Sequence, residues 1–276
     1  MKRDTLLISL LSLIDDTDKS VRDTVRRKLT DLGEDAVEEM ERLAPQLSDK
    51  IDTNFLNCFI DELRLDHTLR RLKNYLSNPD PLLMDGLLLV TEAIRPEIDK
   101  VKYISMVQDI ADDMLADISD NRTAVENLEI FNYIFYKRIG FRHVDESVTK
   151  RENAIITDVL DSKMGNIFTI PLCYFILARY TGLPIYPVIK GRTFTPAFLG
   201  SRDDVLFYIN IFKDGLIFSG KEGEAEENRP RVGLDRALVS IYADHLNYLF
   251  KADGDEVLLK VMEKVLECFG NERYIN

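Results

Sequence analysis

Three cysteines and three histidines are the side chains of this chain that could attack a carbonyl, move a proton or hold a soft metal. They are Cys58, Cys173, Cys268, His67, His143 and His245. They lie far apart in the sequence, without a CxxC pair and without a zinc-type spacing of Cys and His. This dispersion predicts no structural metal and no disulfide framework. Three separated cysteines favour a reducing compartment.

Cys173 is the thiol whose sequence context bears most directly on catalysis. A cysteine nucleophile acts as the thiolate, which the N-terminus of a helix helps to form. Cys173 lies instead inside the apolar run from Leu172 to Ile176. Two interpretations stay open. The residue is a displaced nucleophile of a cysteine hydrolase or acyltransferase, or it is a small buried apolar residue, as free cysteines often are.

Two histidines have neighbours that could assist acid–base chemistry. His143 is followed by Asp145 and Glu146, which would make an acid–base pair, although polar residues from 141 to 152 predict a solvated loop instead. His245 lies in the apolar sequence YADHLNYLF, where packing or local capping is the alternative to a catalytic role. No GxGxxG or Walker-type loop occurs, so we expect no cofactor.

Composition narrows the classes of function. The chain has 276 residues, of which 45% are hydrophobic and 30% charged, so it can bury a core and is expected to fold. It carries 48 acidic and 36 basic residues, for a formal charge of -12. A surface this negative disfavours binding to nucleic acid and to anionic lipid.

The N-terminal apolar run from Leu6 to Ile14 has two interpretations. Lys2 and Arg3 precede it, as in a signal peptide, but Asp15 and the acidic residues after it stand where a cleavage site should be. The run is also shorter than the ~20 apolar residues that cross a bilayer. We therefore expect the first helix of a cytoplasmic protein.

The elements that must position these residues are mostly helices in the first half. Apolar residues at helical spacing predict helices over about 51–77, 81–95, 97–118 and 123–138, after a first helical hairpin. In that hairpin, Asp18 or Ser20 could cap the second helix and Gly33 could end it. The segment from Leu7 to Gly33 resembles a HEAT-type repeat. Residues 1–75 are predicted to form this helical region.

The pattern changes after Gly140. An apolar helix is predicted over 165–181, followed by short β-type runs over 185–189, 194–199, 205–212 and 216–218 that indicate an antiparallel sheet. Two helices, about 234–251 and 255–269, close the chain. The sequence therefore predicts an α+β fold in which 76–230 form the core and 231–276 form a C-terminal helical hairpin.

Two segments of this core resemble a known family. They are FNYIFYKRIGF, residues 131–141, and residues 152–188, which end in ARYTGLPIYPV. Both resemble the SirB-type bacterial branch of the transglutaminase-like superfamily, and the closing hairpin resembles the tetratricopeptide-like tail of that branch. The matching residues are Asn132, Gly140, Phe141, Asn153, Leu160, Gly165, Ala178, Arg179, Gly182, Leu183 and Pro184.

The resemblance implies a Cys–His–Asp triad on a buried helix and two strands. Its Gly-x-Cys opening would place the nucleophile at Ile167, with the histidine near Arg192 and the aspartate near Asn210. None of these types fits its role: isoleucine has no nucleophile, arginine stays protonated, and asparagine carries no charge. The resemblance therefore implies a degenerate triad and a non-catalytic protein.

Three hypotheses follow for function. In the first, the old cleft persists as a groove that binds a protein or peptide, lined by Asn153, Asn166, Arg192 and Asn210. In the second, Cys173 serves a cysteine hydrolase or acyltransferase. In the third, the helical N-terminal region is a scaffold that binds a partner protein. Nothing in the sequence separates the first hypothesis from the third.

Overall fold

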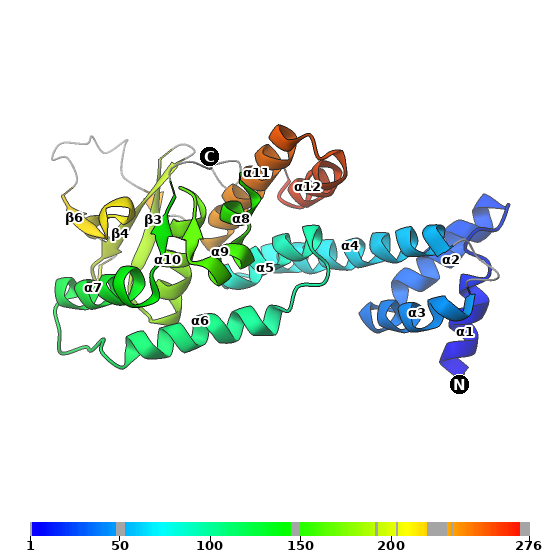
Figure 1. Ribbon diagram of the computed structural model, residues 1–276, viewed down its shortest axis with the longest axis horizontal. Coiled ribbons are helices and arrows are strands. Elements are labelled where there is room, and N and C mark those ends of the chain that lie inside the picture. The colour runs from blue at the N-terminus through cyan, green and yellow to red at the C-terminus, as the bar shows by residue number, and fades with distance from the viewer. Residues whose placement is uncertain are drawn as a thin grey trace. The chain divides into compact units, whose positions relative to one another are not determined.

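The computed structural model describes residues 2–47, 53–144, 150–190, 193–202, 204–219, 231–232 and 234–270 (Figure 1). The chain divides into two compact units, residues 1–74 and residues 75–276, which are called unit 1 and unit 2 below. Arg192 lies near the position that the family resemblance assigns to the histidine, and it is outside the described residues. Asp145 and Glu146, the proposed partners of His143, also lie outside them.

Unit 1 is helical and has a core of its own. It holds α1 (Lys2–Leu11), α2 (Lys19–Asp31), α3 (Glu34–Leu47) and the first part of α4 (Thr53–Ser77). Leucines at helical spacing, such as Leu7, Leu11 and Leu29, meet in this core. Asp18 caps α2 by accepting a hydrogen bond from the Ser20 amide, and Gly33 follows the helix with a positive φ of 86°. Both signals were present in the sequence.

Unit 2 combines a small sheet with helices. The helices are α5 (Leu83–Ile94), α6 (Lys100–Leu115), α7 (Ala124–Asn132), α8 (Arg151–Ala154), α9 (Ile156–Ser162), α10 (Thr169–Tyr180), α11 (Asp235–Asp253) and α12 (Glu256–Cys268). Helix α10 is buried and packs on α6, α9 and strand β3. The closing helices α11 and α12 pack on each other and on α5, so the C-terminal hairpin belongs to this compact unit.

The sheet has five described strands in the order β6-β5-β4-β3-β7, and every neighbouring pair is antiparallel. The strands are β3 (Ile185–Lys190), β4 (Thr193–Leu199), β5 (Val205–Asn210), β6 (Leu216–Phe218) and β7 (Arg231–Val232). This confirms the predicted helices with a small antiparallel sheet. A separate parallel pair joins β1 (Arg142–His143) to β2 (Met164–Gly165), and alternation of residue types did not reveal it.

Three boundaries differ from the sequence prediction. The helix expected over 123–138 is α7 followed by a π-helical segment, η1 (Tyr133–Ile139), which Gly140 ends in a left-handed conformation. The helix expected from residue 165 begins at Thr169, because the preceding residues form β2 and a turn. The loop expected over 141–152 contains β1 and the start of α8. Side-chain periodicity is too similar in π- and α-helices to separate them over two turns.

A helix that crosses a bilayer must be both long and apolar. None of the helices in the described residues is both long enough and apolar enough to cross a membrane. This includes α1, which contains most of the apolar N-terminal run.

Candidate functional site

A cavity of about 470 Å³ opens between the start of α10 and the sheet. Its lining comes from the turn before α10, from α10 itself, from β4, and from the end of β5 with the short 3₁₀ segment η2 (Ile211–Lys213). None of the described lining residues is charged, and most are apolar. They are Ile167, Phe168, Pro171, Phe194, Thr195, Pro196, Ile209, Asn210, Ile211, Phe212 and Phe218.

The start of α10 is organised by one buried side chain. Asn166 Oδ1 accepts hydrogen bonds from the backbone amides of Phe168 (2.9 Å) and Thr169 (3.0 Å), two of the amides that a helix start leaves without partners. The Thr169 hydroxyl donates to the backbone carbonyl of Asn153 at 2.7 Å. The backbone N–H of Asn166 donates to the same carbonyl at 3.0 Å. The turn that carries Ile167 and Phe168 is therefore fixed from behind.

His245 on α11 completes this arrangement. Because Asn166 Oδ1 already accepts two backbone amides, Asn166 Nδ2 is the group that faces His245 Nε2 at 2.8 Å. The imidazole must accept there, so its proton is on Nδ1. The ring also stacks on Phe168, with centroids 4.4 Å apart. Burial lowers the pKa of His245 to about 4, which keeps the ring neutral near pH 7.

The opposite wall is held by η1 and its neighbours. The Tyr136 hydroxyl donates to the Ile211 carbonyl at 2.8 Å, and Asn210 Oδ1 accepts from the Phe212 amide at 3.1 Å. Lys137 pairs with Asp214 at 2.6 Å. These contacts fix η2 next to the cavity, so the apolar wall is supported by polar bonds outside it.

Asn132 links α10 to the same wall. Its Oδ1 accepts a 2.6 Å hydrogen bond from the buried Tyr174 hydroxyl, and its Nδ2 donates to the Gly215 carbonyl at 3.3 Å. Gly215 has a φ of 78°, and a Cβ there would overlap the Asn132 side chain. Only glycine satisfies both conditions, so close approach of the β5–β6 connection to Asn132 depends on this residue.

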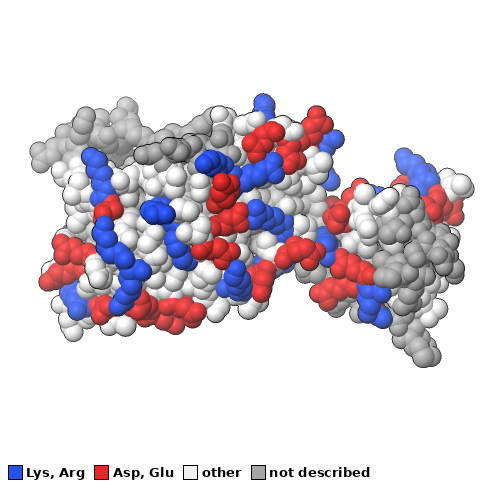
Figure 2. Space-filling model, viewed as in Figure 1, with Lys and Arg blue, Asp and Glu red and all other residues white. Residues whose placement is uncertain are grey.

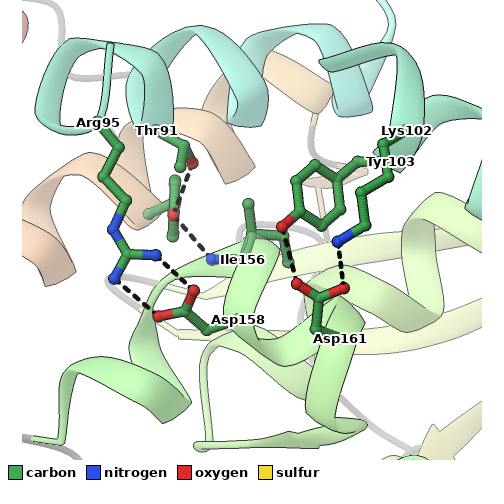
Figure 3. Close-up of polar contacts among 8 residues, drawn as sticks. Thr91, Arg95, Lys102, Tyr103, Ile156, Asp158 and Asp161 are labelled. Carbon is green, nitrogen blue, oxygen red and sulfur yellow. Dashed lines mark hydrogen bonds and ion pairs between the residues drawn. The ribbon is translucent and has the colours of Figure 1, made fainter. Parts of the chain in front are cut away.

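A second polar network positions α9, which leads into β2 and α10. The Thr91 hydroxyl donates to the Leu87 carbonyl, so the Tyr242 hydroxyl donates to Thr91 and accepts from the Ile156 amide, each at 3.0 Å. These bonds join α5, α9 and α11, as Figure 3 shows for the labelled residues. Burial raises the pKa of Tyr242 to about 12, so this hydroxyl stays protonated.

Two acids on α9 extend the network to α5 and α6. Arg95 holds Asp158 with both terminal nitrogens, and Asp161 accepts from Lys102 and from Tyr103 at 2.8 Å each (Figure 3). The Lys102 and Tyr103 hydrogen bonds help to lower the pKa of Asp161 against the opposing effect of burial. These acids form hydrogen bonds and ion pairs between helices, so the network holds α9 against α5 and α6.

The residues predicted for the site fall into three groups. Ile167 and Asn210 line the same cavity, so the positions assigned to the nucleophile and the aspartate come together. Asn153 and Asn166 are buried and bonded in the support of α10, behind the cavity, and they do not line it. The structure therefore places these two asparagines outside the described lining of the cavity. Arg192 lies outside the described residues.

Cys173 is in the interior of α10 and is 1% exposed. Burial raises the pKa of its thiol to about 12, although Lys163 opposes that shift. At pH 7 only about one thiol in 10⁵ would then be ionised. The geometry therefore fits a structural cysteine, and a nucleophilic role finds no support in it.

His143 and the possible metal ligands are the remaining candidates. The His143 ring lies edge-on to Phe212, with centroids 5.0 Å apart, beside the cavity. Within the described ranges, no group of three or more His, Cys, Asp or Glu side chains could hold a metal ion. Sequence reasoning missed the role of Phe168, Phe194, Phe212 and Phe218, because aromatic residues at such spacings are usual in a core.

The comparison with protein families identifies this unit. The family model of the transglutaminase-like superfamily matches residues 101–260, more than half of the chain, which therefore belongs to that superfamily. Two UPF0162 proteins from two strains of Xylella fastidiosa are each 21% identical over 195 residues. The match covers 68% of this chain and 65% of each relative, so it spans less than two thirds of their length. No solved structure matches.

Proposed function

We propose that this protein is a non-catalytic member of the superfamily that binds a protein or peptide partner in the cavity beside α10. One observation carries the proposal. Ile167 and Asn210 stand at the positions that the family resemblance assigns to the cysteine and the aspartate, and they line one apolar cavity. Ile167 has no group that can attack a carbonyl, and Asn210 lacks the negative charge with which an aspartate stabilises an imidazolium. An apolar cavity with a polar edge is the usual form of a binding site.

The finer placement within the superfamily belongs to the same proposal. The residues from Asn132 to Pro184 support the SirB-type branch, and the α1–α2 hairpin with its acidic turn supports a HEAT-like N-terminal segment. The division into 1–75, 76–230 and 231–276, and a cytoplasmic location, are further parts of it. The separated cysteines and the negative charge support that location.

Two measurements test this function. Full-length protein should release no ammonia from glutamine-containing peptides and should not hydrolyse a thioester, and Cys173→Ser should behave identically. The neutral fluorescent dye N-phenylnaphthylamine should bind, and Ile167→Glu should weaken binding by about tenfold or more, because a carboxylate would be desolvated in the cavity. Turnover that Cys173→Ser abolishes would instead establish the cysteine enzyme.

A second candidate places the partner on unit 1. A hollow of about 360 Å³ there combines Phe55 and Phe59 with charged side chains on α2, including Arg22 and Arg26. A photocrosslinking amino acid at position 55 should then capture partner protein in cells, whereas one at position 212, beside the cavity of unit 2, should not. The opposite pattern favours the cavity.

A further inference from the structure

We propose that the occupant of the cavity is a short acidic peptide segment of a partner protein, which inserts an aromatic side chain. The inference rests on the proposed function, since it names the ligand of the same site. It is supported by the apolar lining, by the polar edge of the cavity and by the charges beside it.

The lining is apolar and partly exposed. Ile167 is 42% exposed and Phe212 is 50% exposed, and Phe218 is also exposed. Four phenylalanines contribute to the walls. Aromatic rings pack well against one another in edge-on or offset arrangements, and one ring buries about 150–250 Å². A cavity of this composition matches the side chain of Phe, Tyr or Trp.

The edge of the cavity offers hydrogen bonds but no charge. Asn210 Oδ1 is occupied by the Phe212 amide. The Asn210 Nδ2 group makes no hydrogen bond to any residue that the structure describes, and Thr195 also lies at the lining. An amide donor at the edge of an apolar cavity can bind the backbone carbonyl of the residue that inserts its ring.

Two cations lie next to the cavity, Arg142 and Lys213. Arg142 precedes His143, whose ring contacts Phe212, and its guanidinium reaches Met164, three residues before Ile167. Lys213 directly follows Phe212 and is exposed. Neither cation has a carboxylate partner within the part of the chain that is described. Asp214, the acid that directly follows Lys213, is already paired with Lys137.

The charges around the cavity bear on the choice of ligand. Over the end of unit 2 where α7 and α10 lie, Figure 2 shows Lys and Arg side chains interspersed with Asp, Glu and uncharged residues. The chain as a whole has a net charge of -12, so two cations beside the cavity that have no carboxylate partner among the described residues favour an acidic ligand. A second copy bound through the same face would oppose Arg142 to its own equivalent region, which disfavours a symmetric dimer.

The test uses full-length protein and a fluorescein-labelled peptide, acetyl-Glu-Glu-Phe-Glu-Glu, read by fluorescence anisotropy. We expect a Kd of about 10–100 µM. Replacing the peptide Phe with Ala should weaken binding about tenfold. Replacing the four Glu with Gln should weaken it about threefold to tenfold, and ~0.5 M salt should remove that difference.

Protein variants locate the contacts. Phe212→Ala should weaken the peptide about tenfold, whereas Tyr248→Ala should have no effect. Tyr248 is a matched control, because it is an aromatic residue 59% exposed on α11 and does not line the cavity. The double variant Arg142→Gln, Lys213→Gln should abolish the preference for the Glu peptide over the Gln peptide while it retains the preference for Phe over Ala. Its far-UV spectrum and thermal midpoint should match the wild type.

The outcomes separate this inference from the proposed function. If the Ile167→Glu change weakens binding of the neutral dye but the Glu and Gln peptides bind equally, the cavity is a binding site and the proposal of an acidic ligand is wrong. If neither dye nor peptide responds to changes at Ile167 and Phe212, both proposals fail. Concentration-dependent dimerisation that Phe212→Ala abolishes would show that a second copy of the chain binds this face. That result would overturn the proposal of a peptide ligand.

Discussion

At the scale of single residues, one asparagine determines the state of one histidine. The two backbone amides on Asn166 Oδ1 fix the orientation of its amide group, which then requires His245 Nε2 to accept. Protonating His245 would set two donors against each other. The same imidazole stacks on Phe168, which lines the cavity. Proton binding and the cavity wall are therefore linked through a single contact.

The first prediction concerns pH and stability. Burial lowers the pKa of His245 from 6.5 to about 4, so between these values the unfolded chain binds more protons than the folded chain. The contribution of neutral His245 to the free energy of unfolding should be complete above pH 6.5. It should decrease as the pH falls, by about 3 kcal/mol near pH 4. Urea unfolding from pH 4 to 7 would measure this.

The control for that prediction is His245→Gln, which keeps an acceptor but does not titrate. Its stability should lack the His245 contribution to the slope between pH 4 and 6.5, while contributions from other groups remain. Equal slopes in the variant and the wild type would mean that His245 is not the group responsible.

The second prediction concerns the thiols. Native protein treated with iodoacetamide at pH 8 should be labelled at Cys58, which is exposed, and not at Cys173, which is buried with a thiol pKa near 12. Denaturation in urea should expose Cys173 to labelling. Mass spectrometry of tryptic peptides separates the two sites. Rapid native labelling of Cys173 would return the cysteine-enzyme hypothesis to consideration.

At the scale of elements, the glycine between β5 and β6 allows helix and sheet to approach. Gly215→Ala would force a non-glycine residue to a φ of 78° and would displace Asn132 from Tyr174. We expect a loss of about 2–4 kcal/mol in the free energy of unfolding, of which ~1 kcal/mol is the backbone term. Chemical denaturation of the purified variant provides the measurement.

A double variant divides that loss into its parts. Asn132→Ala removes the overlapping side chain but not the positive φ, so adding it to Gly215→Ala should cost less than the two single changes combined. Strict additivity would indicate that the Asn132 overlap is not the cause of the loss.

Local signals in the sequence were sufficient for most elements and insufficient for the site. Periodic leucines and the caps at Asp18 and Gly33 located helices within a few residues. The start of α10 was misplaced because Asn166, inside the predicted helix, caps it from a turn. Asn153 and Asn166 were expected to line the remnant cleft, but both are buried in the support of α10. Only the fold brings Ile167, Asn210 and four phenylalanines together.

At the scale of the whole molecule, each unit has its own core, and every residue that lines the cavity belongs to unit 2. Unit 1 depends on leucines such as Leu29, which is fully buried. Within unit 2, Arg151 on α8 bonds Asp253 and Asp255 at 2.8 and 2.9 Å, which ties the closing hairpin to the core. We therefore expect a core substitution in one unit to leave the core of the other unit intact.

Leu29→Ala should destabilise unit 1 by about 2–5 kcal/mol, because it leaves a cavity among packed helices. Hydrogen exchange should accelerate in peptides from α1, α2 and α3 but not in those from α10. Binding of N-phenylnaphthylamine should be unchanged. A parallel loss of dye binding would contradict the assignment of the site to unit 2 alone.

The turn before α10 also bears on what a cysteine at position 167 could do. A cysteine installed by Ile167→Cys would meet backbone amides at Phe168 and Thr169 that already donate to Asn166, so its thiolate would find little stabilisation there. Burial keeps His245 neutral, and its Nε2 is already occupied by Asn166 Nδ2. The hydrogen bonds that order the start of α10 therefore leave neither of these two amides available to a thiolate at position 167.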